Sequence, residues 1–543
     1  MDEYEELKAD TSVIGKLLRP FRYLLRRPRK LTICVAIFLA IVTVVCLRRL
    51  LLASNDTEGG LVYPTEGTKC SNIPIPPGYW SLKASEIAAF VDIPDTRAIA
   101  VGGTVCVRVV VPSKQPNTPM SFTPLPGAPW DSVLLDLVGN ATGISIPVAL
   151  KEPRDNGRTG AHVYEADVML RDSDVYRPEG YIEFRDARWN PDGPGLDPQP
   201  FTPERLAIPE DLRIQVTNGK NSLAEYMDLP LCTSADAEGR WVAVADIPFN
   251  ITNMLLPPDN QNRVWMPYDC RMRTVSYPEY AQCLVDRYPV IHWFGDSNTR
   301  RALKKITSLG QWCSTPKDIA SHVCICNDNL EPNDRYNSNA RVMPIDMDPV
   351  SGGVAAAMDN EYLGHQVPGN KSRIVAFKWD GLTDRNRPPW SDPFDRPDGV
   401  GNALQSPTTA IFGVINWDTA FSSRAFFANE VHRLVQKVRT SYPASMDIII
   451  RTGQYYCCAS DMDAFWKRRY SRLRNRHYDH YIVQQFREQL GDTRKISVWD
   501  VASLTERRPY KARDAEVNFC PANHVRSEVI NIENQILMNA MCN

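Results

Sequence analysis

The chain has 543 residues, with 62 Lys and Arg against 64 Asp and Glu, for a formal net charge of −2. That length predicts two or three domains. Hydrophobic residues make up 43% and charged residues 23% of the chain, as in ordinary globular proteins, which excludes wholesale disorder. The near-neutral charge argues against a nucleic-acid-binding protein, which would normally be basic.

The charge is unevenly distributed along the chain. Residues 1–53 carry ten Lys and Arg and five Asp and Glu, whereas the rest carries 52 and 59. The apolar segment Leu31–Leu47 has no charged residue, and it continues beyond Arg48 and Arg49 to residue 53. As a helix, Leu31–Leu47 alone spans about 25 Å, which is enough for a thin bilayer. We predict a cytosolic tail over 1–30 and a transmembrane signal anchor over 31–53. A cleaved signal peptide is the weaker alternative, because thirty residues precede the apolar run.

The orientation of the anchor follows from its flanking charges. Lys and Arg are concentrated before the apolar segment, so the positive-inside rule places the N-terminus in the cytosol and the body in the lumen. Twelve of the 14 cysteines lie beyond the anchor, an even number that favours disulfides in an oxidising compartment. Cysteine and histidine spacings match no zinc motif, so we expect no metal. Four glycosylation sequons also lie beyond the anchor, at Asn55, Asn140, Asn250 and Asn370.

The body of the chain divides by composition into several segments. Residues 54–82 are rich in Pro, Gly and polar residues and are predicted to form a stem. Residues 83–220 contain short Val- and Ile-rich runs separated by turn residues, which predicts an immunoglobulin-like β-sandwich. Residues 221–285 form a connector that contains several Trp and Cys residues. The six expected strands of the sandwich are Thr104–Val111, Asp131–Val138, Ile144–Leu150, Ala161–Leu170, Gly180–Arg188 and Asp211–Thr217.

Residues 286–543 alternate between strand and helix patterns, which predicts a parallel sheet with helices on both faces. Ligand sites of such sheets lie at the carboxyl ends of the strands. Expected strands are Tyr288–Phe294, Ile374–Trp379, Ile411–Ile415, Met446–Arg451 and Ile496–Val501. Expected helices are Thr299–Leu309, Arg424–Thr440, Asp463–Leu490 and Arg526–Met541.

Gly295-Asp296-Ser297 lies where the first strand of this domain passes into a helix. A serine there projects from the sheet at a helix N-terminus, where it can act as a nucleophile and nearby N–H groups can hold an oxyanion. The alternative is a plain helix-capping serine. The histidine that precedes the last helix, His524, is the best candidate base. His292 on the strand is more consistent with a packed core residue.

These motifs resemble the SGNH/PC-esterase superfamily, and most closely its neurexophilin-and-PC-esterase-like branch. The ending HVRSEVINIENQILMNAMC (His524–Cys542) is similar to the terminal segment of that branch, and Ser497–Asp500 to its Asp-containing strand end. Gly239-Arg240-Trp241 and the following Trp and Cys residues resemble plant trichome-birefringence-like O-acetyltransferases. The resemblance implies an α/β, SGNH-type three-layer fold behind the β-sandwich and the single transmembrane helix.

The resemblance also implies roles for individual residues. Ser297 would be the nucleophile, His524 the general base, and Gly381 and Asn416 parts of the oxyanion hole. The superfamily usually has an Asp three residues before the His, but Pro521 stands there in this chain. Asp500 at a strand end is the preferred orienting acid, Asp514 is the alternative, and a Ser–His dyad also remains open.

The resemblance and the anchor together predict a type II, single-pass Golgi membrane protein with a lumenal catalytic domain. The expected activity is O-acetylation of a glycan or polysaccharide through a serine acyl-enzyme. No cofactor would be bound, and an acetyl donor such as acetyl-CoA would be a co-substrate. Two alternatives stay open: a carbohydrate acetylesterase of the same fold, and a catalytically inert protein that binds glycans or proteins.

Overall fold

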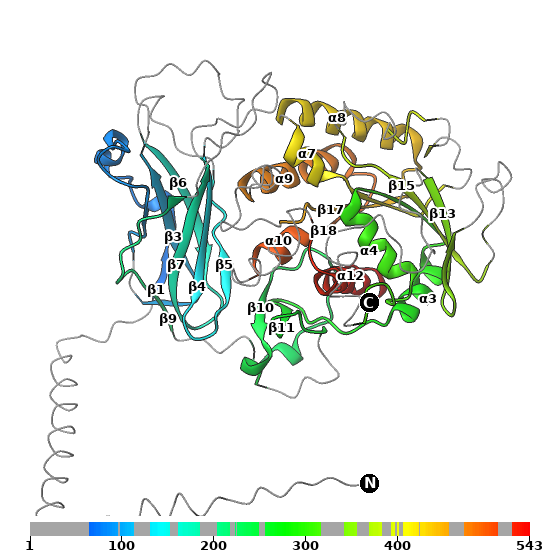
Figure 1. Cartoon of the computed structure of the whole chain (residues 1–543), viewed down its shortest axis with the longest axis horizontal. Helices are drawn as coiled ribbons and strands as arrows, with labels where there is room; N and C mark the ends of the chain where they lie inside the picture. Colours follow the sequence, from blue (N-terminus) through cyan, green and yellow to red (C-terminus); the bar gives the residue numbers. More distant parts are fainter. Residues whose placement is uncertain are drawn as a thin grey trace, which may run out of the picture. The chain divides into compact units, whose positions relative to one another are not determined.

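The computed structural model describes residues 65–95, 98–112, 131–151, 161–184, 204–217, 223, 225–248, 256–315, 342–355, 367, 369–382, 392–396, 399–400, 406–422, 424–455, 472–508 and 524–543 (Figure 1). The predicted cytosolic tail and anchor lie outside these residues. Among the described helices, none is both long enough and apolar enough to cross a membrane. Residues 64–543 belong to one compact unit with a mixed α/β fold, which contains a β-rich region and an α/β region.

The β-rich region is a curled sheet that has nine strands among the described residues. Its strands follow the order β1-β3-β9-β7-β4-β5, with β2 and β6 also paired to β3 and β8 to β7. They are β1 (Thr65–Thr68), β2 (Phe90–Asp92), β3 (Ile99–Val111), β4 (Ser132–Gly139), β5 (Ser145–Pro147), β6 (His162–Met169), β7 (Val175–Phe184), β8 (Glu204–Arg205) and β9 (Ile214–Thr217).

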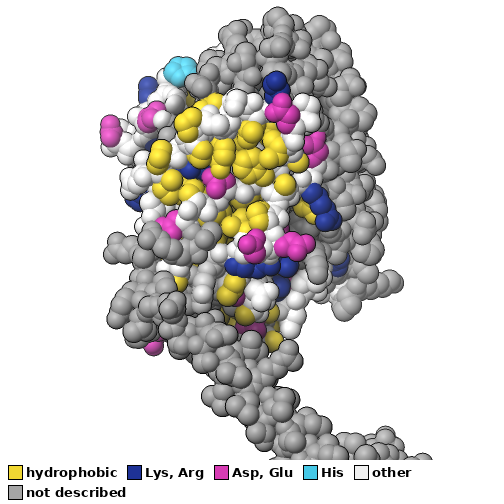
Figure 2. All heavy atoms as spheres, turned by 90° about the vertical axis from the view of Figure 1, so that its left-hand side faces the viewer, with side chains coloured by type: hydrophobic (Ala, Val, Ile, Leu, Met, Phe, Trp, Pro, Cys, Tyr) yellow, Lys and Arg dark blue, Asp and Glu magenta, His cyan; other side chains and the backbone are white. Residues whose placement is uncertain are grey.

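Alternating side chains of the curled sheet face two separate hydrophobic clusters, the larger of which lies inside the curl. Val105, Val107 and Val109 of β3 share a buried cluster with Val133 and Leu135 of β4, although the two strands are not neighbours. Side chains of one strand alternate between faces, and Val110 of β3 lies in the second cluster with Ala161 and Val163, so β3 is buried on both faces along Val105–Val111. Figure 2 shows further hydrophobic side chains gathered on the exposed face of the molecule that carries the β-rich region.

The structure differs from the expected stem. Residues 65–82 hold β1 and two short helices, η1 (Cys70–Asn72) and η2 (Pro77–Ser81), instead of an extended linker. A disulfide joins Cys70 to Cys106 of β3, and β1 pairs with β3 in parallel. This segment is ordered by partners that are distant in sequence, which its Pro- and Gly-rich composition does not reveal.

The α/β region contains a seven-stranded sheet in the described part of the chain, with the order β14-β13-β15-β12-β16-β17-β18. The five strands from β15 to β18 in this order are parallel, as expected, whereas β13 and β14 add an antiparallel edge. The strands are β12 (Val290–Gly295), β13 (Val342–Asp348), β14 (Gly352–Ala355), β15 (Ser372–Lys378), β16 (Thr409–Gly413), β17 (Asp447–Arg451) and β18 (Ile496–Trp499).

Helices cover both faces of this sheet. Ile291 and Trp293 of β12 pack in one cluster with the helices α3, α4 and α12, whereas Phe294 packs in another with α7, α8 and α9. The helices are α3 (Tyr277–Arg287), α4 (Ser297–Thr307), α7 (Ile415–Phe421), α8 (Arg424–Ser441), α9 (Arg472–Leu490), α10 (Val501–Glu506) and α12 (Ser527–Cys542). The Phe294 ring stacks between Phe377 and Phe412 at centroid distances of 4.6 and 4.7 Å.

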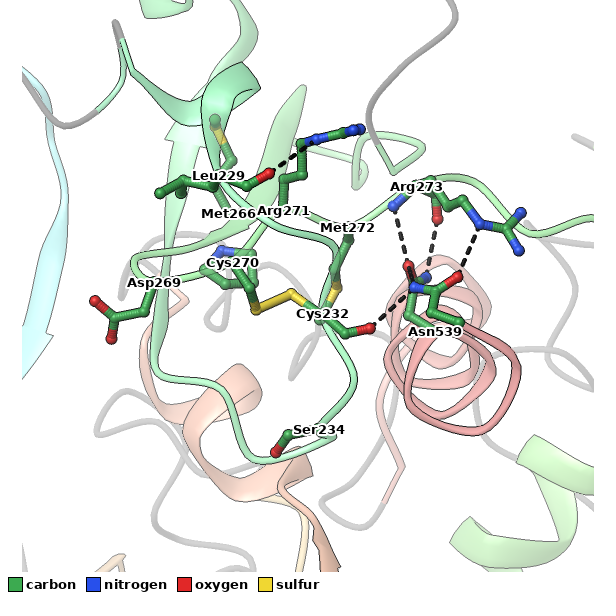
Figure 3. Close-up of a disulfide and its surroundings, with 12 residues drawn as sticks. Leu229, Cys232, Ser234, Met266, Asp269, Cys270, Arg271, Met272, Arg273 and Asn539 are labelled. Atoms are coloured by element: carbon green, nitrogen blue, oxygen red, sulfur yellow. Dashed lines mark hydrogen bonds between the residues drawn. A yellow bond between two sulfur atoms is a disulfide. The ribbon is translucent and has the colours of Figure 1, made fainter.

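The connector is built into the α/β region and holds α12 in place. It contains η3 (Tyr226–Asp228), η4 (Val244–Asp246) and a two-stranded sheet of β10 (Gly239–Ala243) and β11 (Arg263–Pro267). The Cys232–Cys270 disulfide crosses it (Figure 3). Beside this disulfide, the carboxamide of Asn539 on α12 pairs with both backbone groups of Arg273, at 3.0 and 2.9 Å. A second disulfide, Cys283–Cys542, joins α12 to α3.

Buried polar contacts join the β-rich region to the rest of the unit. Arg472 of α9 lies 2.8 Å from Asp136 of β4, and its neighbour Leu473 packs in the core of the curled sheet. Arg240 lies 3.2 Å from Asp172, which also accepts a hydrogen bond from the hydroxyl of Tyr268. These buried contacts join the two regions within the compact unit of residues 64–543.

Candidate active site

Ser297 is the first residue of α4 and lies at the carboxyl edge of the sheet, immediately after β12 and the capping residue Asp296. Two glycines let the helix approach the sheet here. A Cβ atom on Gly295 would lie 2.3 Å from Cβ of Thr299, and one on Gly413 would lie 2.2 Å from the Thr299 hydroxyl oxygen. Both distances are too short for any larger residue, so glycine at these positions brings the first turn of α4 against β12 and β16.

Ser297 and His524 lie in direct contact. The Ser297 Oγ atom is 2.8 Å from His524 Nε2, and only 8% of the His524 surface is exposed. When Nδ1 carries the proton, Nε2 accepts a hydrogen bond from the hydroxyl, which is the arrangement in which a histidine activates a serine nucleophile. The predicted contact between Ser297 and His524 is therefore present in the structure.

The segment that carries His524 is held by α4 itself. The Arg301 guanidinium donates a 2.7 Å hydrogen bond to the carbonyl oxygen of Val525. Further along α12, the Asn534 carboxamide donates to the carbonyl of Ala302 at 3.0 Å. Because Ser297 and Arg301 lie on the same helix, α4 positions both members of the Ser297–His524 contact. The sequence contains no local signal for Arg301, since its partner lies 224 residues away.

No carboxylate orients His524 among the described residues, because its Nδ1 atom has no hydrogen-bond partner there. The Asp500 carboxylate instead caps α10, where it accepts from the Ser503 N–H at 3.0 Å and from the Thr452 hydroxyl at 3.2 Å. The structure thus does not bring Asp500 into contact with His524. The alternative acid, Asp514, lies outside the described residues. Within the described residues, the arrangement is a Ser–His dyad.

The two residues expected in the oxyanion hole follow the two strands that flank β12. Gly381 comes shortly after β15, and Asn416 lies in the first turn of α7 after β16. The Asn416 carboxamide is engaged with the backbone of Gln454, donating at 2.9 Å and accepting at 3.1 Å. Asp418 links the two loops, because its carboxylate accepts from the Leu382 N–H at 2.7 Å. Sequence reasoning missed this linking residue.

The N-terminus of α4 offers fewer free N–H groups than the sequence suggests. The Asp296 carboxylate accepts hydrogen bonds from the backbone N–H groups of Asn298 and Thr299, at 3.0 and 3.2 Å. These two donors are therefore committed to the cap and cannot also stabilise an oxyanion. Burial raises the pKa of Asp296, while the nearby Arg451 and Arg300 act in the opposite direction.

The other histidine near the motif is a core residue. His292 is buried, and its Nδ1 atom lies 2.7 Å from the Tyr442 hydroxyl. Burial lowers the pKa of His292 to about 3, so this imidazole is neutral at ordinary pH. Its position on the face of β12 opposite to α4 separates it from Ser297.

The remaining predicted sites are only partly within the described residues. Asn140 and Asn370 are exposed, as a glycosylation site requires, whereas Asn55 and Asn250 lie outside. Among the described residues, one group of potential metal ligands comes together, Cys70, Cys106 and Glu165. Since the two cysteines are joined in a disulfide, this group is not a metal site.

No family model matches the chain, and no curated protein is significantly similar to it.

Proposed function

We propose that this chain is an SGNH-type glycan O-acetyltransferase of the Golgi lumen, with Ser297 as nucleophile and His524 as general base. The observation that carries the proposal is the 2.8 Å contact between Ser297 Oγ and His524 Nε2. It lies at the carboxyl edge of a parallel sheet, where open α/β sheets place their ligand sites. In this proposal the curled β-rich region is the immunoglobulin-like sandwich, and the described disulfides support a lumenal, oxidising location.

The proposed reaction has two half-reactions that use the same pair of residues. Ser297 Oγ attacks the acetyl carbonyl of a donor such as acetyl-CoA, while His524 takes the hydroxyl proton. The C–S bond then breaks, the thiol leaves with that proton, and an acetyl-serine remains. A sugar hydroxyl gives its proton to His524 and attacks the ester, which returns Ser297 and releases the acetylated glycan. The oxyanion of each tetrahedral intermediate would be stabilised by groups near Gly381 and Asn416.

The two alternatives differ in their use of the dyad. An acetylesterase would form the same acyl-enzyme and pass the acetyl group to water. An inert binding protein has no use for a serine and a histidine in hydrogen-bond contact, so the dyad argues against that function.

The test compares the full-length chain in detergent with Ser297→Ala and His524→Gln, using acetyl-CoA, a panel of neutral oligosaccharides and 4-nitrophenyl acetate. We expect each substitution to lower turnover by at least about a thousandfold, because neither member of the pair works alone. Ser314→Ala, an exposed serine just beyond α4, is the matched control and should retain full activity.

Each outcome separates the candidate functions. Acetylated oligosaccharide identifies a transferase, and free acetate alone identifies an esterase. Full turnover by Ser297→Ala would refute the mechanism, and no turnover by the wild-type chain would favour the binding protein.

A further inference from the structure

A cavity of about 580 Å³ lies between the β-rich region and the α/β region. Leu150, Lys151 and Tyr164 line it from the β-rich side, and residues of α9, α10 and the ends of β17 and β18 line it from the other. Neither Ser297 nor His524 is among its lining residues. Its volume is within the range of pockets that bind small ligands, and pockets of this kind are frequent between domains.

The cavity lies along the same edge of the sheet as the nucleophile. Two of its lining residues, Thr452 and Asp500, directly follow β17 and β18, which are the second and third strands from β12. Neighbouring strands are about 4.8 Å apart, so these residues lie roughly 10 and 14 Å from the end of β12. A few linked sugar rings can cover such a distance.

The lining combines an apolar floor with polar groups of both signs. Leu473, Val483 and Val498 supply aliphatic surface. Two of the acidic groups have partners, because the Arg476 guanidinium lies 2.6 Å from the Glu506 carboxylate and Asp500 caps α10. A pyranose ring has an apolar C–H face and a rim of hydroxyl groups, and it matches such a lining.

A buried carboxyl group adds to this character. Asp479 lines the cavity and accepts a 2.8 Å hydrogen bond from the Gly453 N–H. Burial, with the neighbouring Asp500 and Glu506, raises the pKa of Asp479 well above its usual value. A protonated carboxyl both donates and accepts hydrogen bonds, as hydroxyl groups require.

We propose that this cavity binds neutral pyranose units of the acceptor glycan, a few rings away from the unit that Ser297 acetylates, with the β-rich region as one wall. The cavity as a carbohydrate site stands on its own lining, whereas the assignment of its ligand as the acceptor rests on the proposed function. The β-rich region is then part of the substrate site and not a spacer.

The experiment measures binding of xylohexaose, mannohexaose and cellohexaose to the detergent-solubilised full-length chain. Val483→Trp and Ser503→Trp each place an indole in the cavity from a different helix, and Gln484→Trp adds the same side chain at the neighbouring exposed position of α9. We expect at least one hexasaccharide to bind the wild-type chain and Gln484→Trp equally. Its Kd should rise at least tenfold in both cavity variants. Thermal unfolding identifies a cavity variant that fails to fold. In that case, the Kd of the other cavity variant decides whether the hexasaccharide binds in the cavity.

Two outcomes would overturn the inference: no hexasaccharide binds the wild-type chain, or both folded cavity variants bind as the wild-type chain does. The variant Ser297→Ala tests the proposed function independently of the cavity. That variant should keep hexasaccharide binding and lose hydrolysis of 4-nitrophenyl acetate. If it keeps both, the acyl-transfer mechanism fails while the carbohydrate site stands.

Discussion

Ser297 and His524 come into contact although 227 residues separate them in the chain. Each could be predicted from its local context, Ser297 from the passage of a buried strand into a helix and His524 from its place before an amphipathic helix. Their partners could not. Arg301 and Asp418 act through backbone groups of distant loops, and a backbone carbonyl or N–H leaves no mark in the amino-acid sequence.

At the same scale, His292 predicts how stability depends on pH. Its pKa is about 3 in the folded protein and 6.5 in the unfolded chain, so only the unfolded chain gains a proton between those values. The stabilising effect of a neutral His292 is complete above pH 6.5 and is lost as the pH falls. Protonation of His292 in the unfolded chain should therefore lower the free energy of unfolding by about 2 kcal/mol between roughly pH 6.5 and 5.

The variant His292→Gln keeps a partner for the Tyr442 hydroxyl but does not titrate. Its melting temperature, measured from about pH 7 to 5, should therefore fall less steeply than that of the wild-type chain. The exposed His432→Gln on α8 is the control and should follow the wild-type curve. Parallel curves for all three proteins would show that His292 does not govern this pH range.

The regular elements of the α/β region were largely predictable, because buried strands and amphipathic helices have clear periodicities. β12, β15, β17 and α8 lie within a few residues of their expected bounds. The antiparallel edge strands β13 and β14 were missed, because Pro344 and the aspartates of β13 and the two glycines of β14 are residues that strands disfavour. β1 was missed because its sequence, Thr65–Thr68, contains no hydrophobic residue.

At the scale of elements, the contact between α4 and the segment that precedes α12 should control the rate of the proposed chemical step. We expect Arg301→Met to lower kcat for 4-nitrophenyl acetate by roughly a hundredfold, because His524 loses a support that places it within reach of Ser297. KM should change little, since Arg301 is not expected to touch the substrate. Arg301→Lys keeps one donor and should recover part of the loss.

Arg494→Met tests whether removal of any buried arginine has this effect. Arg494 also donates to backbone carbonyl oxygens, those of Val438 and Tyr442, on the other face of the sheet. It should lower the melting temperature without lowering kcat in the folded protein. Equal kcat losses in the two Met variants would rule out a positioning role for Arg301.

At the scale of the whole molecule, buried ion pairs and the packing of Leu473 join the described parts of the β-rich and α/β regions. An even strand pattern suggested a separate domain, but sequence periodicity carries no information about which surfaces pack together. Arg472 illustrates the point: it is an ordinary basic residue in a helical segment, yet it is buried between Asp136 and Glu506.

The two regions should consequently unfold in one transition. Asp136→Ala leaves Arg472 buried without one of its carboxylates and should destabilise the protein by about 3 kcal/mol. The double variant Asp136→Ala/Arg472→Leu should lose less than the sum of the single variants, because it removes both charges. Denaturant unfolding, followed by circular dichroism and Trp fluorescence, measures both effects. Separate transitions for the two probes, or additive losses, would show that the regions are not coupled.

The Cys283–Cys542 disulfide has a consequence for biosynthesis. Its two cysteines are 259 residues apart, whereas those of Cys70–Cys106 and Cys232–Cys270 are 36 and 38 apart. The short pairs can close early during translation, but Cys283 must wait while other thiols of the α/β region are made. During that interval Cys283 is free to form wrong bonds, so a disulfide isomerase is expected to assist maturation. The helix that follows His524 is linked to α3 only after this pairing, so the proposed activity is expected to depend on its oxidation.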